Sequence, residues 1–138
     1  MRRLYIDGAW VPSACGEGVD VIDPATERVI DRVPAGARAD VDAAVAAARA
    51  AFPGWAATPP AARAEVLAAA AGLLAERAER LARVITTDLG APYPFALKVH
   101  VGLPLRVLGS YAELARRFPF EGERAGASLV ARGPAGVA

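Results

Sequence analysis

The sequence predicts the α/β fold class, with β-hairpins first, three helical stretches next and a strand at the end. The first 35 residues combine short β-prone runs with turn signals and show no helical period. From about Ala39 to Arg117, apolar residues recur at intervals of three and four, and an alternating run follows Phe118. These observations divide one domain of residues 1–138 into a β-hairpin region (1–35), a helical region (36–118) and a strand region (119–138).

The composition excludes several classes of protein. With 54% hydrophobic and 22% charged residues, the chain is too apolar for an intrinsically disordered protein. Sixteen basic and fifteen acidic residues leave a net charge of +1, too small to mark a protein that binds nucleic acid. The longest uncharged apolar run, Val66–Ala75, has about half the length needed to span a bilayer. We therefore expect a cytoplasmic protein with no nucleic-acid or membrane partner.

The N-terminal strands are predicted from β-prone runs and the turns between them. Asp7-Gly8 separates Leu4–Ile6 from Ala9–Val11, and this dipeptide favours a tight type I′ hairpin turn. Val19–Ile22 and Val29–Val33 are further β-prone runs, and each is followed by a proline within two residues. This region is therefore predicted to form hairpins and no helix.

The first helix is predicted to begin at Ala39. Asp40 and Asp42 fall in its first turn, where negative charge complements the helix dipole. We expect Phe52-Pro53-Gly54 to end the helix and Trp55 to follow as a large anchor. The apolar positions of one face are Val41, Ala44, Val45, Ala48 and Phe52.

A second, longer helix is predicted from Thr58 to Asp88. Thr58-Pro59 resembles a capped start, Gly90 provides a left-handed stop, and 31 residues would extend about 45 Å. Its apolar stripe consists of Leu67, Ala70, Leu74, Ala78, Leu81 and Ile85, and Glu76/Arg80 and Glu79/Arg83 are spaced as ion pairs on the opposite face.

The third helical stretch runs from about Tyr93 to Arg117. We expect a kink at Gly102-Leu103-Pro104, because proline removes one hydrogen bond and clashes with the preceding turn. After the kink, Leu105, Leu108, Ala112 and Ala115 form an apolar stripe. Ser128–Arg132 then alternates as a strand, and a further extended element begins at Gly133.

Cys15 and His100 are the only cysteine and the only histidine of the chain. One cysteine excludes an intrachain disulfide and a cysteine-based zinc site. A catalytic thiol needs a basic partner, and no histidine lies near Cys15 in the sequence. We interpret Cys15 as a loop residue and His100 as a structural residue.

Six segments follow one another along the chain: Leu4–Trp10, Val21–Thr26, Asp40–Val45, Ala51–Trp55, Leu89-Gly90 and Ser128–Val137. Their order and spacing resemble the start of the aldehyde dehydrogenase family. The family commonly carries a glutamate where this sequence has Gly133. No single segment is diagnostic alone. The order and spacing of the segments together carry the resemblance, which covers nearly the whole chain.

The resemblance implies that a whole family member oxidises an aldehyde with NAD or NADP. In that chemistry a cysteine thiolate attacks the aldehyde, hydride passes to the nicotinamide, and the thioester is hydrolysed. No position of this sequence corresponds to the family's catalytic or cofactor-binding residues. These are the Pro-Trp-Asn segment, the nucleophilic cysteine, the general-base glutamate and the nicotinamide-binding residues, which come later in the family's sequences. The sequence therefore assigns no catalytic and no cofactor-binding residue, and we expect this N-terminal part alone to be inactive and to bind no NAD or NADP.

The resemblance also implies one candidate metal site and a mode of assembly. Many family members bind a monovalent cation through backbone carbonyls and a carboxylate, and the matching positions are Val21, Ile22 and Asp88. Asp23 stands where asparagine is common in the family. The parent enzyme is expected to be a homo-oligomer whose arm begins in the last strand. A stand-alone helical binding or assembly module and one half of a split enzyme remain alternatives.

Overall fold

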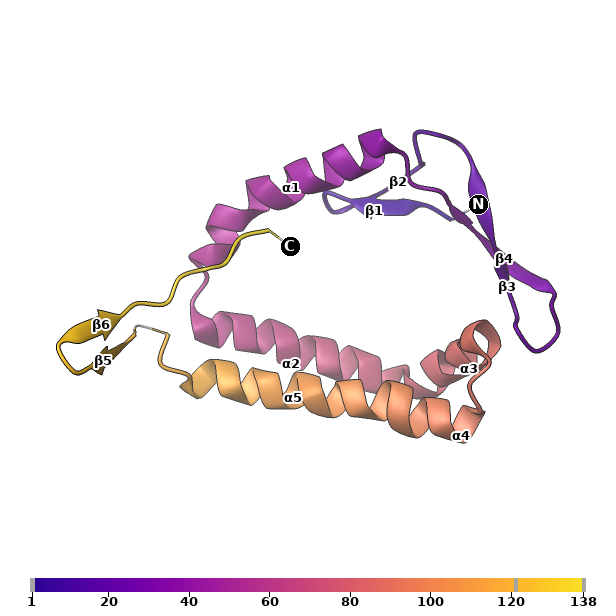
Figure 1. The fold of residues 1–138 in the computed structure, drawn as a ribbon. Coiled ribbons are helices and arrows are strands. Elements are labelled where there is room, and N and C mark those ends of the chain that lie inside the picture. The colour runs from indigo at the N-terminus through magenta and orange to yellow at the C-terminus, as the bar shows by residue number, and fades with distance from the viewer. Residues whose placement is uncertain (1, 121, 138) are drawn as a thin grey trace.

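The computed structural model describes residues 2–120 and 122–137 (Figure 1). Strand β1 (Leu4–Ile6) pairs antiparallel with β2 (Ala9–Val11), and Tyr5 lies opposite Trp10. Asp7 and Gly8 both have positive φ, 51° and 75°. This confirms the predicted type I′ hairpin, which requires left-handed backbone at both central residues.

A second hairpin joins β3 (Gly18–Ile22) to β4 (Val29–Pro34), as the β-prone runs predict. The register shifts between Val21 and Ile22, which marks a β-bulge near the end of β3. A bulge bends its strand locally, so the end of β3 and the turn after it are redirected. The two hairpins form separate two-stranded sheets.

Helix α1 (Arg38–Ala56) starts close to the predicted residue but does not stop where predicted. It continues through Pro53, which lies in its last turn, so the proline removes only one hydrogen bond near the helix end. Trp55 is therefore part of the helix and does not follow it as predicted, and 51% of its surface is exposed. Val41 and Val45 are also exposed. The predicted apolar face exists but is largely uncovered.

The predicted single helix from Thr58 to Asp88 is two helices, α2 (Pro60–Glu76) and α3 (Ala78–Leu89). Arg77 breaks the helix, because its φ of −106° and ψ of 9° depart from helical values. Thr58 does not cap α2, since its hydroxyl donates back to the Gly54 carbonyl at 3.0 Å. The predicted Glu76/Arg80 and Glu79/Arg83 ion pairs are not among those of the described residues.

The predicted apolar stripe survives this break. Gly90 ends α3 with φ 77°, which confirms the predicted left-handed stop. Helix α2 packs along α5 (Gly102–Arg117), and the two run in opposite directions (Figure 1). Arg116 and Glu65 form an ion pair at 2.7 Å between them. The stripe residues are all half-buried: Leu67, Ala70, Leu74, Ala78, Leu81 and Ile85.

The third helical stretch is irregular earlier than predicted. Helix α4 (Tyr93–Phe95) passes into a π-helical segment, η1 (Ala96–Val101), and α5 then begins at Gly102. Pro104 lies in the first turn of α5, where a missing N–H costs least. The carbonyls that would accept a hydrogen bond from this nitrogen lie in η1. The departure from regular α-helical hydrogen bonding is therefore found in the turn before Pro104. The predicted stripe of α5 is confirmed as half-buried or buried.

The core of the described residues consists of small side chains. No large side chain is fully buried within the described residues. A cluster of Ala82, Ala96 and Val101 joins α3 and η1, and Leu105 of α5 packs against it. Ala64 in α2 and Ala112 in α5 are the other buried apolar residues of the described chain.

The C-terminal region contains a short hairpin followed by irregular chain. Strand β5 (Glu123–Ala125) pairs antiparallel with β6 (Ser128–Val130), which is shorter than the predicted run to Arg132. The structure assigns no strand to residues 131–137, so the extended element predicted from Gly133 is not a paired strand. In residues 2–120 and 122–137, no helix combines the length and apolar character needed to cross a membrane.

Candidate functional site

A pocket of about 570 Å³ lies between the β3–β4 hairpin and α3. Val21 from β3 and Asp88 from the end of α3 both line it. Two of the three predicted cation ligands are therefore brought to one pocket from positions 67 residues apart. Ile22 does not line this pocket, and its side chain is 52% exposed.

The end of α3 packs closely against the turn that follows β3. A Cβ added to Gly90 would lie 2.9 Å from Cγ of Pro24, closer than ordinary side-chain contacts. The turn itself is held by Asp23, whose carboxylate accepts the Ala25 N–H at 2.8 Å. That hydrogen bond lowers the pKa of Asp23. The two segments that carry the predicted ligands are therefore in direct contact.

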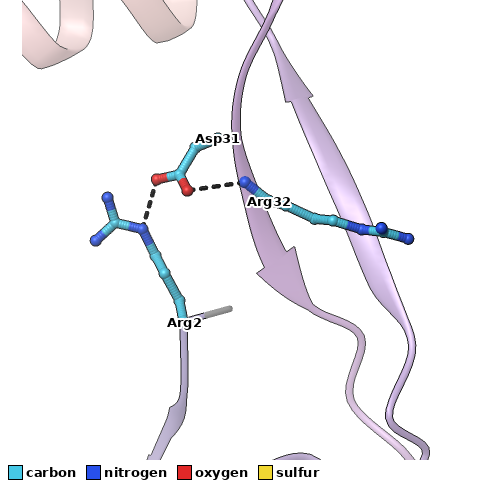
Figure 2. Close-up of polar contacts among 3 residues, drawn as sticks. All are labelled: Arg2, Asp31 and Arg32. Atoms are coloured by element: carbon cyan, nitrogen blue, oxygen red, sulfur yellow. Dashed lines mark hydrogen bonds and ion pairs between the residues drawn. The ribbon is translucent and has the colours of Figure 1, made fainter.

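The pocket contains charges of both signs. Arg2, Arg80 and Arg83 line it together with Asp31 and Asp88. The Asp31 carboxylate accepts the backbone N–H of Arg32 at 2.8 Å and pairs with the Arg2 guanidinium (Figure 2). These two contacts hold the pKa of Asp31 below its usual value, and the hydrogen bond from the Arg32 N–H has the larger effect.

Arg83 lines the pocket together with Asp88 but contacts an aromatic ring. The Arg83 guanidinium lies 5.2 Å from the centre of the Tyr93 ring, a cation–π contact. No ion pair of the described residues involves Asp88. Residues 2–120 and 122–137 contain no group of three His, Cys, Asp or Glu side chains arranged to hold a metal. One carboxylate with backbone carbonyls suits a hard cation of low charge better than a zinc or iron ion.

A second polar cluster, at the start of α1, was missed by sequence reasoning. Asp40 is 9% exposed and accepts the N–H of Ala37 at 2.8 Å, the hydroxyl of Ser13 at 2.9 Å and the N–H of Ala14 at 3.1 Å. These contacts lower the pKa of Asp40, and the hydrogen bond from the Ala37 N–H has the largest effect. Aspartate at the third helical position was the available signal, because such a side chain can bond back to the N-cap.

Neither Cys15 nor His100 lies in a catalytic arrangement within the described residues. Cys15 is exposed, and its Sγ lies 3.2 Å from the Ala35 carbonyl and 3.3 Å from the Ser13 hydroxyl. Neither neighbour is a base or a cation that would stabilise a thiolate. His100 lies in η1 with its ring edge-on to Phe95, 5.2 Å between centroids. Cys15 thus lies in a turn, as the loop interpretation predicts, and His100 packs against an aromatic ring.

The sequence matches a known protein family over most of its length. The model of the aldehyde dehydrogenase family matches residues 10–138. The chain belongs to the aldehyde dehydrogenase family. It corresponds to the N-terminal portion of a family member.

Individual aldehyde dehydrogenases agree in sequence and in fold. The 3-succinoylsemialdehyde-pyridine dehydrogenase of a Pseudomonas species is 37% identical over 142 residues, covering 99% of this chain and 28% of that protein. The solved structure of an AldC variant from Pseudomonas syringae, with NAD+ and octanal, is 38% identical over 91% of this chain and 26% of its own, with a TM-score of 0.86.

An indole-3-acetaldehyde dehydrogenase from Pseudomonas syringae, AldA, gives the same result. Its structure with NAD+ and IAA is 32% identical, covers 97% of this chain and 28% of its own, and has a TM-score of 0.86. The chain thus spans about a quarter of the length of the aldehyde dehydrogenases it matches. Several of these family members are solved with NAD+, so NAD(P) is the cofactor of the parent family.

Proposed function

We propose that this chain is the N-terminal structural part of an enzyme that oxidises an aldehyde to a carboxylic acid with NAD+ or NADP+. The observation that carries the proposal is the match to AldC, a family member solved with NAD+ and octanal, over 91% of this chain at a TM-score of 0.86. Action on an aldehyde as a homo-oligomer is part of the same proposal for the whole enzyme.

In this proposal the reacting groups lie in the part of the family fold that this chain does not cover. Oxidation through a thioester needs an activated thiol, donors for an oxyanion and a general base in one cleft. Within the described residues, Cys15 contacts a carbonyl and a hydroxyl instead of a base. NAD(P), when bound, accepts the hydride, and the residues of this chain supply the frame that supports the rest of the fold.

A chimera tests this function directly. In it, this chain replaces the matching N-terminal part of Pseudomonas syringae AldC, and formation of NADH and NADPH is measured with octanal, indole-3-acetaldehyde and betaine aldehyde. We expect turnover by the chimera and none by the 138-residue chain. The matched control is Cys15→Ser, which should leave the turnover of the chimera unchanged. Turnover by the short chain that is lost on Cys15→Ser would overturn the proposal.

We also propose that the backbone carbonyls of Val21 and Ile22 and the carboxylate of Asp88 hold a monovalent cation. The shared pocket of Val21 and Asp88 and the contact between Gly90 and Pro24 support it. A cation bound only by the folded chain stabilises it by mass action. The thermal midpoint should therefore be higher in potassium chloride than in choline chloride of equal ionic strength, and Asp88→Asn should abolish the difference.

The control for the cation experiment is Asp42→Asn. Asp42 lies in α1, and its only ion pair among the described residues is an exposed one with Arg38 at 3.7 Å. This variant should keep the difference between the two salts. Equal midpoints of the unsubstituted chain in both salts would exclude the cation site.

A further inference from the structure

The chain exposes far more surface than a folded monomer of its size. Its accessible area is 10102 Å² for a mass of 14.2 kDa, whereas a monomeric protein of that mass exposes about 6,800 Å². The excess of about 3,300 Å² is larger than the share of one partner in most obligate interfaces. Much of this surface is therefore expected to be covered by another part of a protein.

Helix α1 carries a continuous part of this uncovered surface. Val41, Val45 and Trp55 are 58%, 36% and 51% exposed, and the half-buried Phe52 lies between them on the same helix face. We call these four residues the α1 stripe. Figure 1 shows α1 lying apart from the α2–α5 pair, and it makes its main contact with β1. No helix of the described chain packs along the stripe.

The last described residues lead the chain toward the stripe. Val137 joins Val45, Arg49 and Phe52 around a pocket of about 470 Å³. In Figure 1 the C-terminal end lies between α1 and α2. A polypeptide that continues the family fold beyond this point therefore starts beside the stripe.

The lengths of the relatives indicate which part of a protein would cover the α1 stripe. AldC and AldA match this chain over 26% and 28% of their own length, so about three quarters of the family fold lies outside it. A second copy of this chain would cover only one face. The excess accessible area of about 3,300 Å² is larger than the area that one partner buries in most dimers. A body about three times larger can cover several faces at once.

We propose that the α1 stripe docks the remaining three quarters of the aldehyde dehydrogenase fold, and that it holds this partner even when the two are separate polypeptides. The inference rests on the proposed function for the identity of the partner. Four apolar side chains on one helix face form a non-polar contact of the kind found at the centre of permanent interfaces.

The experiment produces the AldC chimera as two polypeptides in one cell. One is this 138-residue chain with an affinity tag, and the other is the remaining C-terminal part of AldC. We expect the two to purify together as a complex of equal stoichiometry. Val45→Asp combined with Trp55→Asp should reduce the amount of co-purified partner at least tenfold.

Ala50→Asp is the matched control, because Ala50 is exposed on the opposite side of α1. It should leave co-purification unchanged, and circular dichroism should show the same helix content in all variants. Failure to co-purify, or equal loss with Ala50→Asp, would overturn the docking proposal. A defined dimer of the tagged chain that excludes the AldC part would identify a second copy as the occupant instead. An inactive one-chain chimera beside an intact two-chain complex would overturn only the proposed function.

Discussion

Asp40 shows how one side chain joins two segments of this fold. Its carboxylate is buried and accepts donors from the loop at Ser13 and Ala14 and from Ala37, the residue before α1. The start of α1 and the loop before β3 are therefore positioned by the same group. Each donor favours the charged carboxylate, which is why the pKa of Asp40 is lowered.

We predict that Asp40→Asn lowers the thermal midpoint at neutral pH by several degrees and reduces the acid sensitivity of the chain. Because the folded pKa is lowered, the stabilisation is complete above the unfolded pKa of about 3.9 and is lost as the pH falls through the folded value. Thermal unfolding between neutral and acidic pH measures both effects. Asp42→Asn, at an exposed position, should behave like the unsubstituted chain, and an equal effect of both variants would contradict this role of Asp40.

The helices show which parts of the fold a sequence pattern can predict. Every position of the stripe from Leu67 to Ile85 is half-buried, as the helical period predicts, although the helix breaks at Arg77. The break itself could not be predicted, because Arg77 is a good helix former without a neighbouring proline. Pro53 caused the opposite error, since a proline near a helix end costs too little to stop the helix.

Two glycine substitutions should change stability in opposite directions. Gly90→Ala places a Cβ on a residue with φ 77° and 2.9 Å from Pro24, so we expect a loss of about 1–2 kcal/mol or more. Gly72→Ala lies inside α2 with open space around the added Cβ, so a gain of about 0.5–1 kcal/mol is expected. Urea unfolding of both variants measures the difference, and a shift in the same direction would refute the helix-end role of Gly90.

The arrangement of the whole molecule could be predicted only through the family resemblance. The hydrophobic period identifies the apolar faces of α1 and α2 equally well, yet α2 packs along α5 whereas α1 packs along no helix of the described residues. The same limit applies to the candidate site. Its residues Val21 and Asp88 come together through the contact of Gly90 with Pro24, which depends on tertiary structure that spacing does not encode.

At this scale we predict that the isolated chain binds a hydrophobic dye and associates with itself. The reason is the uncovered surface and not the 45 Å helix expected from the sequence, since that helix is broken at Arg77. Dye fluorescence and light scattering after size-exclusion chromatography measure the two properties. A monomer that binds no dye and melts in one sharp transition would contradict the prediction and favour a stand-alone module.

The alanine core has a consequence for how this chain can change. Ala64, Ala82 and Ala96 have no exposed surface, and the elements around them approach closely because only methyl groups separate them. A larger residue at these positions would push neighbouring helices apart, whereas glycine would remove only one methyl group and weaken the helix by about 0.5–1 kcal/mol. Mutation-sensitive positions of this protein are therefore expected among its smallest side chains, whereas many of its large apolar residues are exposed.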